Sequence, residues 1–175
     1  AKRYRQAYKT AMKKKQNLLI LSLSIITFFV IGFLYEIDYR ILTRSSVKYF
    51  ASFKIEYYGG KGFRIFETDI AFILTLIPIS FFILSKNLTS LIKKLILAMI
   101  YLVGIIGFYC FYCYLESEFI SITSKLGAYR NGNFMYHSNN INYRGILFST
   151  IISTFVIGIV SKKIITKPAY NSRHD

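Results

Sequence analysis

The chain has 175 residues, of which 54% are hydrophobic and 18% aromatic, and its formal charge is +15. A soluble domain of this length carries more charge and fewer long apolar runs, so the composition favours a membrane protein. Membrane proteins concentrate Lys and Arg in cytoplasmic segments, and direct nucleic-acid binding is therefore not expected. Cys110 and Cys113 lie in one apolar run and predict neither a disulfide framework nor a zinc site.

Residues 1–16 form a basic segment that contains seven of the lysines and arginines. Its spacing predicts a weak amphipathic helix that can lie on anionic lipid. Lys13, Lys14 and Lys15 either fix the orientation of the chain in the membrane or form a docking surface for a soluble partner.

The first predicted span covers residues 17–37. Asn17 to Tyr35 holds no charge and no proline, and as a helix it is about 28 Å long, close to the hydrocarbon thickness of a bilayer. The apolar stretch is too long for a signal peptide and no small-residue cleavage site follows it, so we expect an uncleaved span.

The next segment, residues 38–68, is predicted to form a first outer loop. Arg40, Arg44 and Lys48 recur every four residues, which predicts a short interfacial helix with a basic rim. After it, residues 53–57 and 63–66 flank a glycine-rich turn and predict a small hairpin.

The second predicted span, residues 69–86, contains a proline in its middle. Pro78 removes one backbone hydrogen bond and is expected to kink the helix, and the hydroxyl of Thr75 is expected to satisfy part of the freed backbone.

The third predicted span covers residues 95–115, and Gly104 and Gly107 are candidates for close helix packing. A second outer loop, residues 116–143, follows it. Within that loop Asn131-Gly132 lies between residues of matching type, which predicts a two-residue hairpin.

The fourth predicted span covers residues 144–161, and residues 162–175 form a basic tail. Ser149 and Ser153 are small residues four apart, so they lie on one helical face and allow another helix to approach closely. Together with the glycines of the third span they predict self-association of the chain into a homo-oligomer.

The predicted fold class is therefore an all-α membrane protein with four transmembrane helices and two outer loops of about 30 residues. Four spans place both termini on one side. With cytoplasmic termini, the inner segments hold 14 basic residues, Lys93 and Lys94 among them, and the longer outer segments hold 9. This bias predicts an integral protein of the bacterial inner membrane with both termini in the cytoplasm; the reverse topology is the alternative.

Six of the eight acidic residues lie at the predicted outer ends of spans. Asp69 is expected to begin a helix, where the dipole favours an anion, whereas Glu36 and Glu116 are expected near helix C-termini, where the dipole opposes one. Two interpretations remain: a ring of ordinary ion pairs, with Arg40, Arg44, Arg64, Arg130 and Arg144 as candidate partners, or a surface that senses ligands or attracts cations. The candidate residues are Glu36, Asp38, Asp69, Glu116 and Glu118.

No enzyme signature, cofactor site or metal-ligand cluster is recognisable, and the centres of the predicted spans hold no ionisable residue. We therefore expect a non-catalytic subunit that oligomerises, senses or scaffolds, and docks a soluble partner on its basic cytoplasmic face. An oligomeric pore lined by Ser and Thr residues is the first alternative, and an accessory subunit of a larger membrane complex is the second.

The arrangement of the whole chain resembles the small membrane subunit of Kiwa-type bacterial anti-phage systems. The resemblance rests on the basic start at Lys2-Arg3 and Lys13-Lys14-Lys15, the four apolar runs and the two outer loops. It implies four spans with cytoplasmic termini and a membrane sensor that restrains or recruits a soluble DNA-binding effector. No residue motif supports it, so it implies no functional residues.

Overall fold

The structure is a computed structural model that describes residues 2–51, 55–58, 68–86, 88–124, 129–130, 133–137 and 141–166. It is predominantly helical. Three helical stretches in these ranges are long and apolar enough to cross a membrane, namely Lys15–Leu34, Leu91–Ile122 and Tyr143–Thr166. The fourth apolar stretch, Asp69–Ser85, is shorter.

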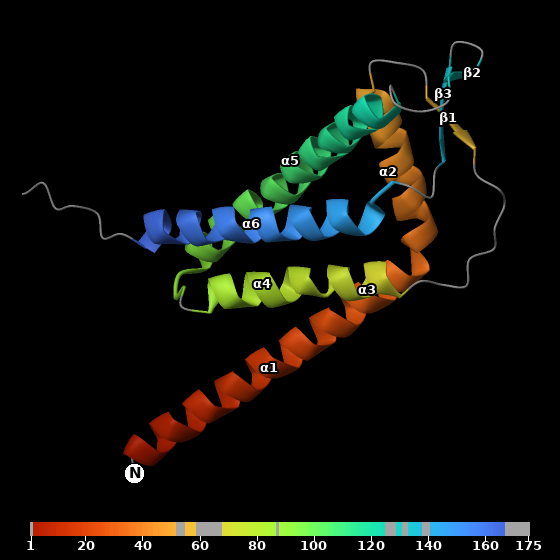
Figure 1. Ribbon diagram of the computed structural model, residues 1–175. Coiled ribbons are helices and arrows are strands. Elements are labelled where there is room, and N and C mark those ends of the chain that lie inside the picture. Colours follow the sequence, from red (N-terminus) through yellow and green to blue (C-terminus); the bar gives the residue numbers. More distant parts are fainter. Residues whose placement is uncertain are drawn as a thin grey trace, which may run out of the picture.

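The first helix, α1 (Lys2–Leu34), joins the basic segment and the first predicted span into one rod. It ends three residues before the predicted boundary because Tyr35 leaves the helical conformation, with φ −107° and ψ 18°. The chain turns there into α2 (Glu36–Phe50), which runs across the end of the other helices (Figure 1). The short helix expected in the first outer loop is thus present, but it begins four residues before Arg40.

The second predicted span is divided into α3 (Asp69–Leu74) and α4 (Leu76–Ser85). The division at Thr75 follows from Pro78, which has no N–H to donate to the carbonyl of Leu74 four residues earlier. The Thr75 hydroxyl donates a hydrogen bond of 2.6 Å to the carbonyl of Phe72, and the Thr75 N–H donates to the same oxygen. The interruption confirms the kink expected at Pro78. The expected role of Thr75 is wrong, because its hydroxyl bonds to the carbonyl of Phe72 and not to the carbonyl of Leu74 that Pro78 leaves without a donor.

The last two long helices are α5 (Leu91–Ser124) and α6 (Tyr143–Thr166). The prediction that a loop begins at residue 116 is wrong, because α5 continues to Ser124. Ser117 and Ile120 are fully buried in this extension, and packing of this face keeps the segment helical. Likewise α6 continues past Ser161 for five residues of the predicted tail.

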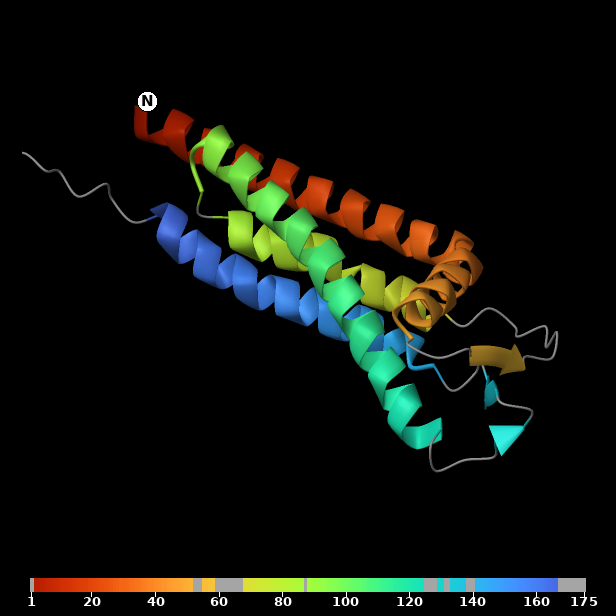
Figure 2. The same cartoon turned by 90° about the horizontal axis from the view of Figure 1, so that it is seen from above.

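The four helical passages alternate in direction (Figures 1 and 2). One end of the molecule holds the start of α1, the connection between α4 and α5, and the end of α6. We call it the lysine end after Lys15, Lys86, Lys94 and Lys162. The opposite end holds α2 and three short strands, and we call it the sheet end. α3 and α4 together form a passage that packs between α1 and α6, and α5 crosses α6 obliquely.

The strands are β1 (Ile55–Tyr58), β2 (Tyr129–Arg130) and β3 (Asn133–His137). β2 and β3 pair antiparallel, with Arg130 opposite Asn133, as expected for a hairpin in the second predicted loop. The Asn131-Gly132 turn itself lies outside the described residues. β1 lies parallel to β3, so its described partner comes from the other loop. The hairpin expected between residues 53–57 and 63–66 lies largely outside the described residues.

Two buried clusters hold the helices together. The larger lies toward the sheet end and joins α2, α3, α5 and α6; its members are Val47, Ile70, Cys113, Ile120, Ile141, Tyr143, Ile146, Leu147 and Ile151. The smaller lies toward the lysine end and consists of Leu84, Leu88, Leu97 and Tyr101. In the second cluster the Tyr101 hydroxyl shares a short hydrogen bond with the Ser80 hydroxyl, so the phenol is satisfied inside an apolar contact.

α1 packs on α3 at a glycine. A Cβ atom at Gly32 would lie 2.6 Å from the Cα of Ala71, so only glycine permits this separation of the two helices. Most of the remaining surface of α1 is apolar and exposed, with Leu18, Leu19 and Leu23 each more than 60% exposed. A helix that is apolar around its circumference and barely buried is suited to a hydrocarbon environment.

Candidate functional site

The first polar site lies at the sheet end, around the start of α6. Glu36 is only 7% exposed and its Oε1 accepts hydrogen bonds from Arg40 at 2.7 and 3.0 Å. The Arg40 guanidinium in turn lies 5.2 Å from the centroid of the Tyr143 ring, within cation–π range. The carboxylate of α2 is therefore linked through Arg40 to the first residue of α6.

Tyr39 makes a second link between the same helices. Its hydroxyl donates a hydrogen bond of 2.9 Å to the backbone carbonyl of Tyr143. Burial raises the pKa of the Tyr39 phenol above its ordinary value, although a hydrogen bond with Thr43 opposes the shift. The phenol consequently stays protonated at physiological pH and remains a donor.

Two further acids reach the start of α6 from other helices. Asp69, the first residue of α3, forms an ion pair of 2.8 Å with Arg144. Glu116 on α5 accepts a hydrogen bond of 3.1 Å from the backbone N–H of Asn142. The side chain of Asn142 accepts the N–H of Gly145 at 2.9 Å and so caps the N-terminus of α6.

We call this set of contacts the α6 anchor, comprising Glu36, Tyr39, Arg40, Asp69, Glu116, Asn142, Tyr143 and Arg144. Three of the five candidate acids belong to it. Asp38 is exposed and Glu118 partly exposed, and neither takes part in these contacts. Arg40 and Arg144 are among the ion-pair partners that the sequence suggested; the side chains of Arg64 and Arg130 lie outside the described part.

The prediction that Glu36 and Glu116 lie near helix C-termini, where the helix dipole opposes an anion, is wrong. Glu36 is the first residue of α2, where the helix dipole favours an anion, because the chain leaves the helix at Tyr35. Glu116 lies well inside α5, eight residues before its end. Of the three acids, only Asp69 has the environment predicted for it, at the start of α3.

Hydroxyl groups bridge α5 to its neighbours. The Tyr109 hydroxyl donates to the Thr43 hydroxyl of α2 at 3.2 Å, and the Tyr112 and Ser153 hydroxyls lie 2.7 Å apart between α5 and α6. The candidate packing residue Ser153 therefore contacts α5 of the same chain. Ser149 lines a hollow of about 250 Å³ beside Glu116.

The two candidate glycines of α5 differ. A Cβ atom at Gly104 would lie 3.1 Å from Thr154, which places Gly104 in the contact between α5 and α6. At Gly107 no heavy atom of the described chain lies within 4 Å of such a Cβ atom. Whether Gly107 packs against a second copy stays a prediction.

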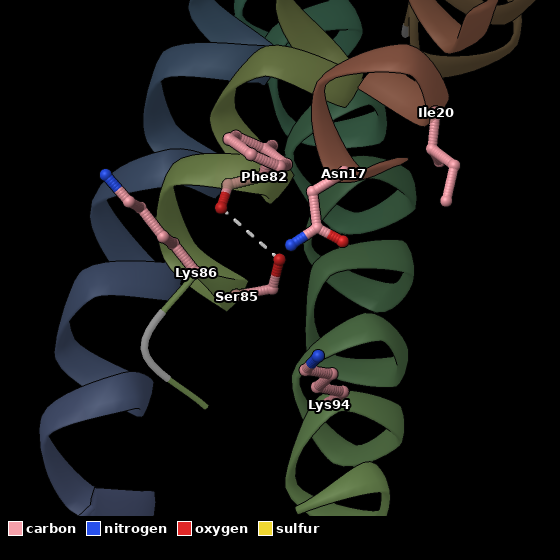
Figure 3. Close-up of a pocket in the computed structure, with 6 residues that line it drawn as sticks. All are labelled: Asn17, Ile20, Phe82, Ser85, Lys86 and Lys94. Carbon is pink, nitrogen blue, oxygen red and sulfur yellow. Dashed lines mark hydrogen bonds between the residues drawn. The ribbon is translucent and has the colours of Figure 1, made fainter. Parts of the chain in front are cut away.

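The second polar site is a hollow of about 140 Å³ at the lysine end, between α1, the end of α4 and the start of α5. We call it the lysine hollow; it is lined by Asn17, Ile20, Phe82, Ser85, Lys86 and Lys94 (Figure 3). Asn17, Ser85 and Lys94 direct polar atoms toward the same space, whereas the ammonium group of Lys86 points away from it (Figure 3).

The candidate lysines all lie at this end. Lys15 and Lys94 are exposed and Lys93 is partly exposed; the side chains of Lys13 and Lys14 lie outside the described part. Lys162, near the end of α6, donates a long hydrogen bond of 3.5 Å to the carbonyl of Ile83 in the last turn of α4. A cation at this position stabilises the C-terminal end of a helix.

Sequence reasoning missed three members of the α6 anchor, namely Tyr39, Asn142 and Tyr143. Asn142 had a recognisable signal, because asparagine directly before an apolar helical run is a common N-cap. Tyr39 and Tyr143 are 104 positions apart, and nothing in the local pattern of either predicts their contact.

No family model, curated protein or solved structure matches the chain. The site therefore rests on its own geometry.

Proposed function

We propose that this chain is a non-catalytic integral membrane subunit that oligomerises and acts as a sensor or scaffold, with four spans, both termini in the cytoplasm and the sheet end outside. The single observation that carries the proposal is the α6 anchor. It joins α2, α3 and α5 to the first residues of α6, and α6 then runs without interruption to the lysine end. A contact that alters the outer segments would act on a rigid element that ends at the basic face.

Four passages through the bilayer require α3 and α4 to act as one span. Together with Thr75 they make 17 residues (69 to 85), about 26 Å of helix, slightly less than the hydrocarbon thickness. A short span is accommodated by local thinning of the bilayer at modest cost. The passage also packs between α1 and α6, which shields much of it from lipid.

The positions of the hydroxyl groups support a scaffold over a pore. Ser80 is bonded to Tyr101, Ser153 to Tyr112, and Thr150 and Thr154 are buried with their hydroxyls on their own helix carbonyls. Ser22 and Thr27 are exposed on α1 but also donate to carbonyls one turn earlier. The protons of these hydroxyls are used within the chain, so only their acceptor lone pairs would face the water of a pore.

The basic face at the lysine end suits an acidic surface of a soluble partner, with Lys13, Lys14, Lys15, Lys93 and Lys94 as its candidate residues. In the Kiwa-type arrangement that the chain resembles, this partner would be a DNA-binding effector and the stimulus would come from phage infection. That part of the proposal rests on layout alone.

The test is purification of the tagged full chain in a gentle detergent from its native cell, followed by native mass spectrometry. The proposal predicts a homo-oligomer with a stoichiometric soluble companion. Because the docking is electrostatic, raised salt and the substitution Lys15→Glu should weaken it, and the triple change Lys13→Glu, Lys14→Glu, Lys15→Glu should abolish it.

Lys48→Glu is the matched control, since Lys48 is also an exposed lysine but lies at the sheet end, and it should leave the companion bound. A companion that is retained in high salt and in the triple variant would overturn docking at this face. A homo-oligomer without a companion that conducts ions in liposomes would favour the pore, and substoichiometric recovery with large membrane proteins would favour an accessory subunit.

A further inference from the structure

The geometry points to the lysine hollow as a binding site for the phosphate headgroup of an anionic phospholipid. This inference needs the helices to be embedded in a bilayer, but it does not depend on a soluble partner. The hollow is formed by three separate segments, α1, the end of α4 and the start of α5, so it exists only when these helices are packed together.

The polar lining has the composition that an anionic headgroup requires. Lys94 supplies a cationic donor, and Asn17 supplies an amide donor on the opposite wall (Figure 3). The Ser85 hydroxyl lies between them and donates only a long hydrogen bond of 3.3 Å to Phe82 within its own helix. It can therefore turn toward a phosphate oxygen without losing a strong interaction.

No carboxylate competes for these donors in the described part of the chain. The hollow has no acidic lining residue, and the acids with described side chains, Glu36, Asp38, Asp69, Glu116 and Glu118, belong to segments at the sheet end. The charge of Lys94 is therefore left to solvent or to a ligand. Basic pockets between transmembrane helices at the cytoplasmic side are typical binding places for acidic lipid headgroups.

The surroundings of the hollow distinguish a lipid from a free anion. Ile20 and Phe82 contribute apolar lining beside the polar groups. On the two flanking helices, the neighbouring side chains Leu19 and Leu91 are 65% and 71% exposed. Exposed apolar side chains on the same helices as a cationic hollow fit a molecule with an anionic head and acyl chains. The volume of about 140 Å³ exceeds the roughly 30 Å³ of one liquid water, so the hollow has room for a group larger than a single water molecule.

The test is native mass spectrometry of the delipidated full chain in an uncharged detergent, with phosphatidylglycerol or phosphatidylcholine added at equal concentrations. Wild type should retain one phosphatidylglycerol per chain in clear preference to phosphatidylcholine. Lys94→Gln should reduce that preference about five-fold, the size expected for one basic side chain at an anionic headgroup. Lys94→Arg should restore it, and Lys163→Gln, an exposed lysine at the same end outside the hollow, should leave it unchanged.

Competition with added inorganic phosphate distinguishes a lipid headgroup from a free phosphate ion as the ligand of the hollow. If the acyl chains contribute, millimolar phosphate should not displace the bound lipid. Equal binding of the two lipids by wild type would overturn the inference, and this measurement does not depend on the folding of any variant. Equal effects of Lys94→Gln and Lys163→Gln, or complete displacement by phosphate, would also overturn it. Loss of a soluble companion in Lys15→Glu with unchanged lipid retention would show that the two activities are separate.

Discussion

The phenol of Tyr39 donates a hydrogen bond of 2.9 Å to the backbone carbonyl of Tyr143. This contact joins the helix that crosses the sheet end to the first residue of α6. A backbone carbonyl at the N-terminal turn already accepts bonds within the helix, so the second donor fixes the position of α2 relative to α6 without disturbing the helix.

Tyr39→Phe removes this donor and should lower the free energy of unfolding by about 1 kcal/mol, the contribution of a typical intramolecular hydrogen bond, because the carbonyl of Tyr143 loses its second donor. The measurement is thermal unfolding in detergent. Tyr49→Phe removes the same atom from a side chain that is 84% exposed and should have no measurable effect. Equal effects of the two substitutions would contradict a specific role for the Tyr39 contact.

The acids of the α6 anchor should contribute unequally. Glu36 is 7% exposed and bonded to Arg40, so Glu36→Gln weakens a largely buried ion pair and should cost about 2 kcal/mol. Asp69 and Arg144 are 45% and 52% exposed, and such solvated pairs contribute about 0–1 kcal/mol. Asp69→Asn should therefore cost less and lose its effect at high salt.

A urea or heat titration of both variants at two ionic strengths checks this ranking. A larger cost for Asp69→Asn than for Glu36→Gln would mean that the burial of Glu36 does not decide its contribution.

Two glycine substitutions test the helix contacts. Gly32→Ala should destabilise the chain by about 1–3 kcal/mol, because the new methyl group would overlap the backbone of Ala71 at 2.6 Å. Gly107→Ala meets no atom within 4 Å in the described chain, and alanine is the better helix former by about 1 kcal/mol.

Gly107→Ala should therefore leave the stability of the single chain unchanged or raise it slightly, as measured by thermal unfolding at low protein concentration. If Gly107→Ala instead weakens oligomers in crosslinking while leaving the single chain stable, Gly107 lies in the interface between copies. A cost equal to that of Gly32→Ala in the isolated chain would refute the packing described for both glycines.

Local signals in the sequence predict much of the helical framework. Length, hydropathy and the charge step identify α1, and Pro78 predicts the division between α3 and α4. The Asn131-Gly132 dipeptide predicts the pairing of β2 with β3. In each of these cases a few neighbouring residues determine the backbone conformation.

Features that depend on distant contacts were not predictable in this way. The extension of α5 depends on burial of Ser117 and Ile120 against other helices, and the parallel pairing of β1 with β3 joins two separate loops. The outer acids were recognised as a group, but their convergence on α6 depends on the fold. Charge can indicate that Asp69 needs a partner, but it cannot distinguish Arg144 from Arg64 or Arg130.

The central claim is that α3 and α4 cross the bilayer as one passage and place the sheet end outside and the lysine end inside. Labelling of single cysteines in a variant without Cys110 and Cys113 tests it most directly. Tyr49→Cys at the sheet end and Thr89→Cys in the connection between α4 and α5 are both exposed positions. In spheroplasts, a membrane-impermeant maleimide should modify the cysteine at 49 at once and the cysteine at 89 only after permeabilisation. Modification of both from the same side would mean that this passage does not cross, and the chain would then have three spans with its termini on opposite sides.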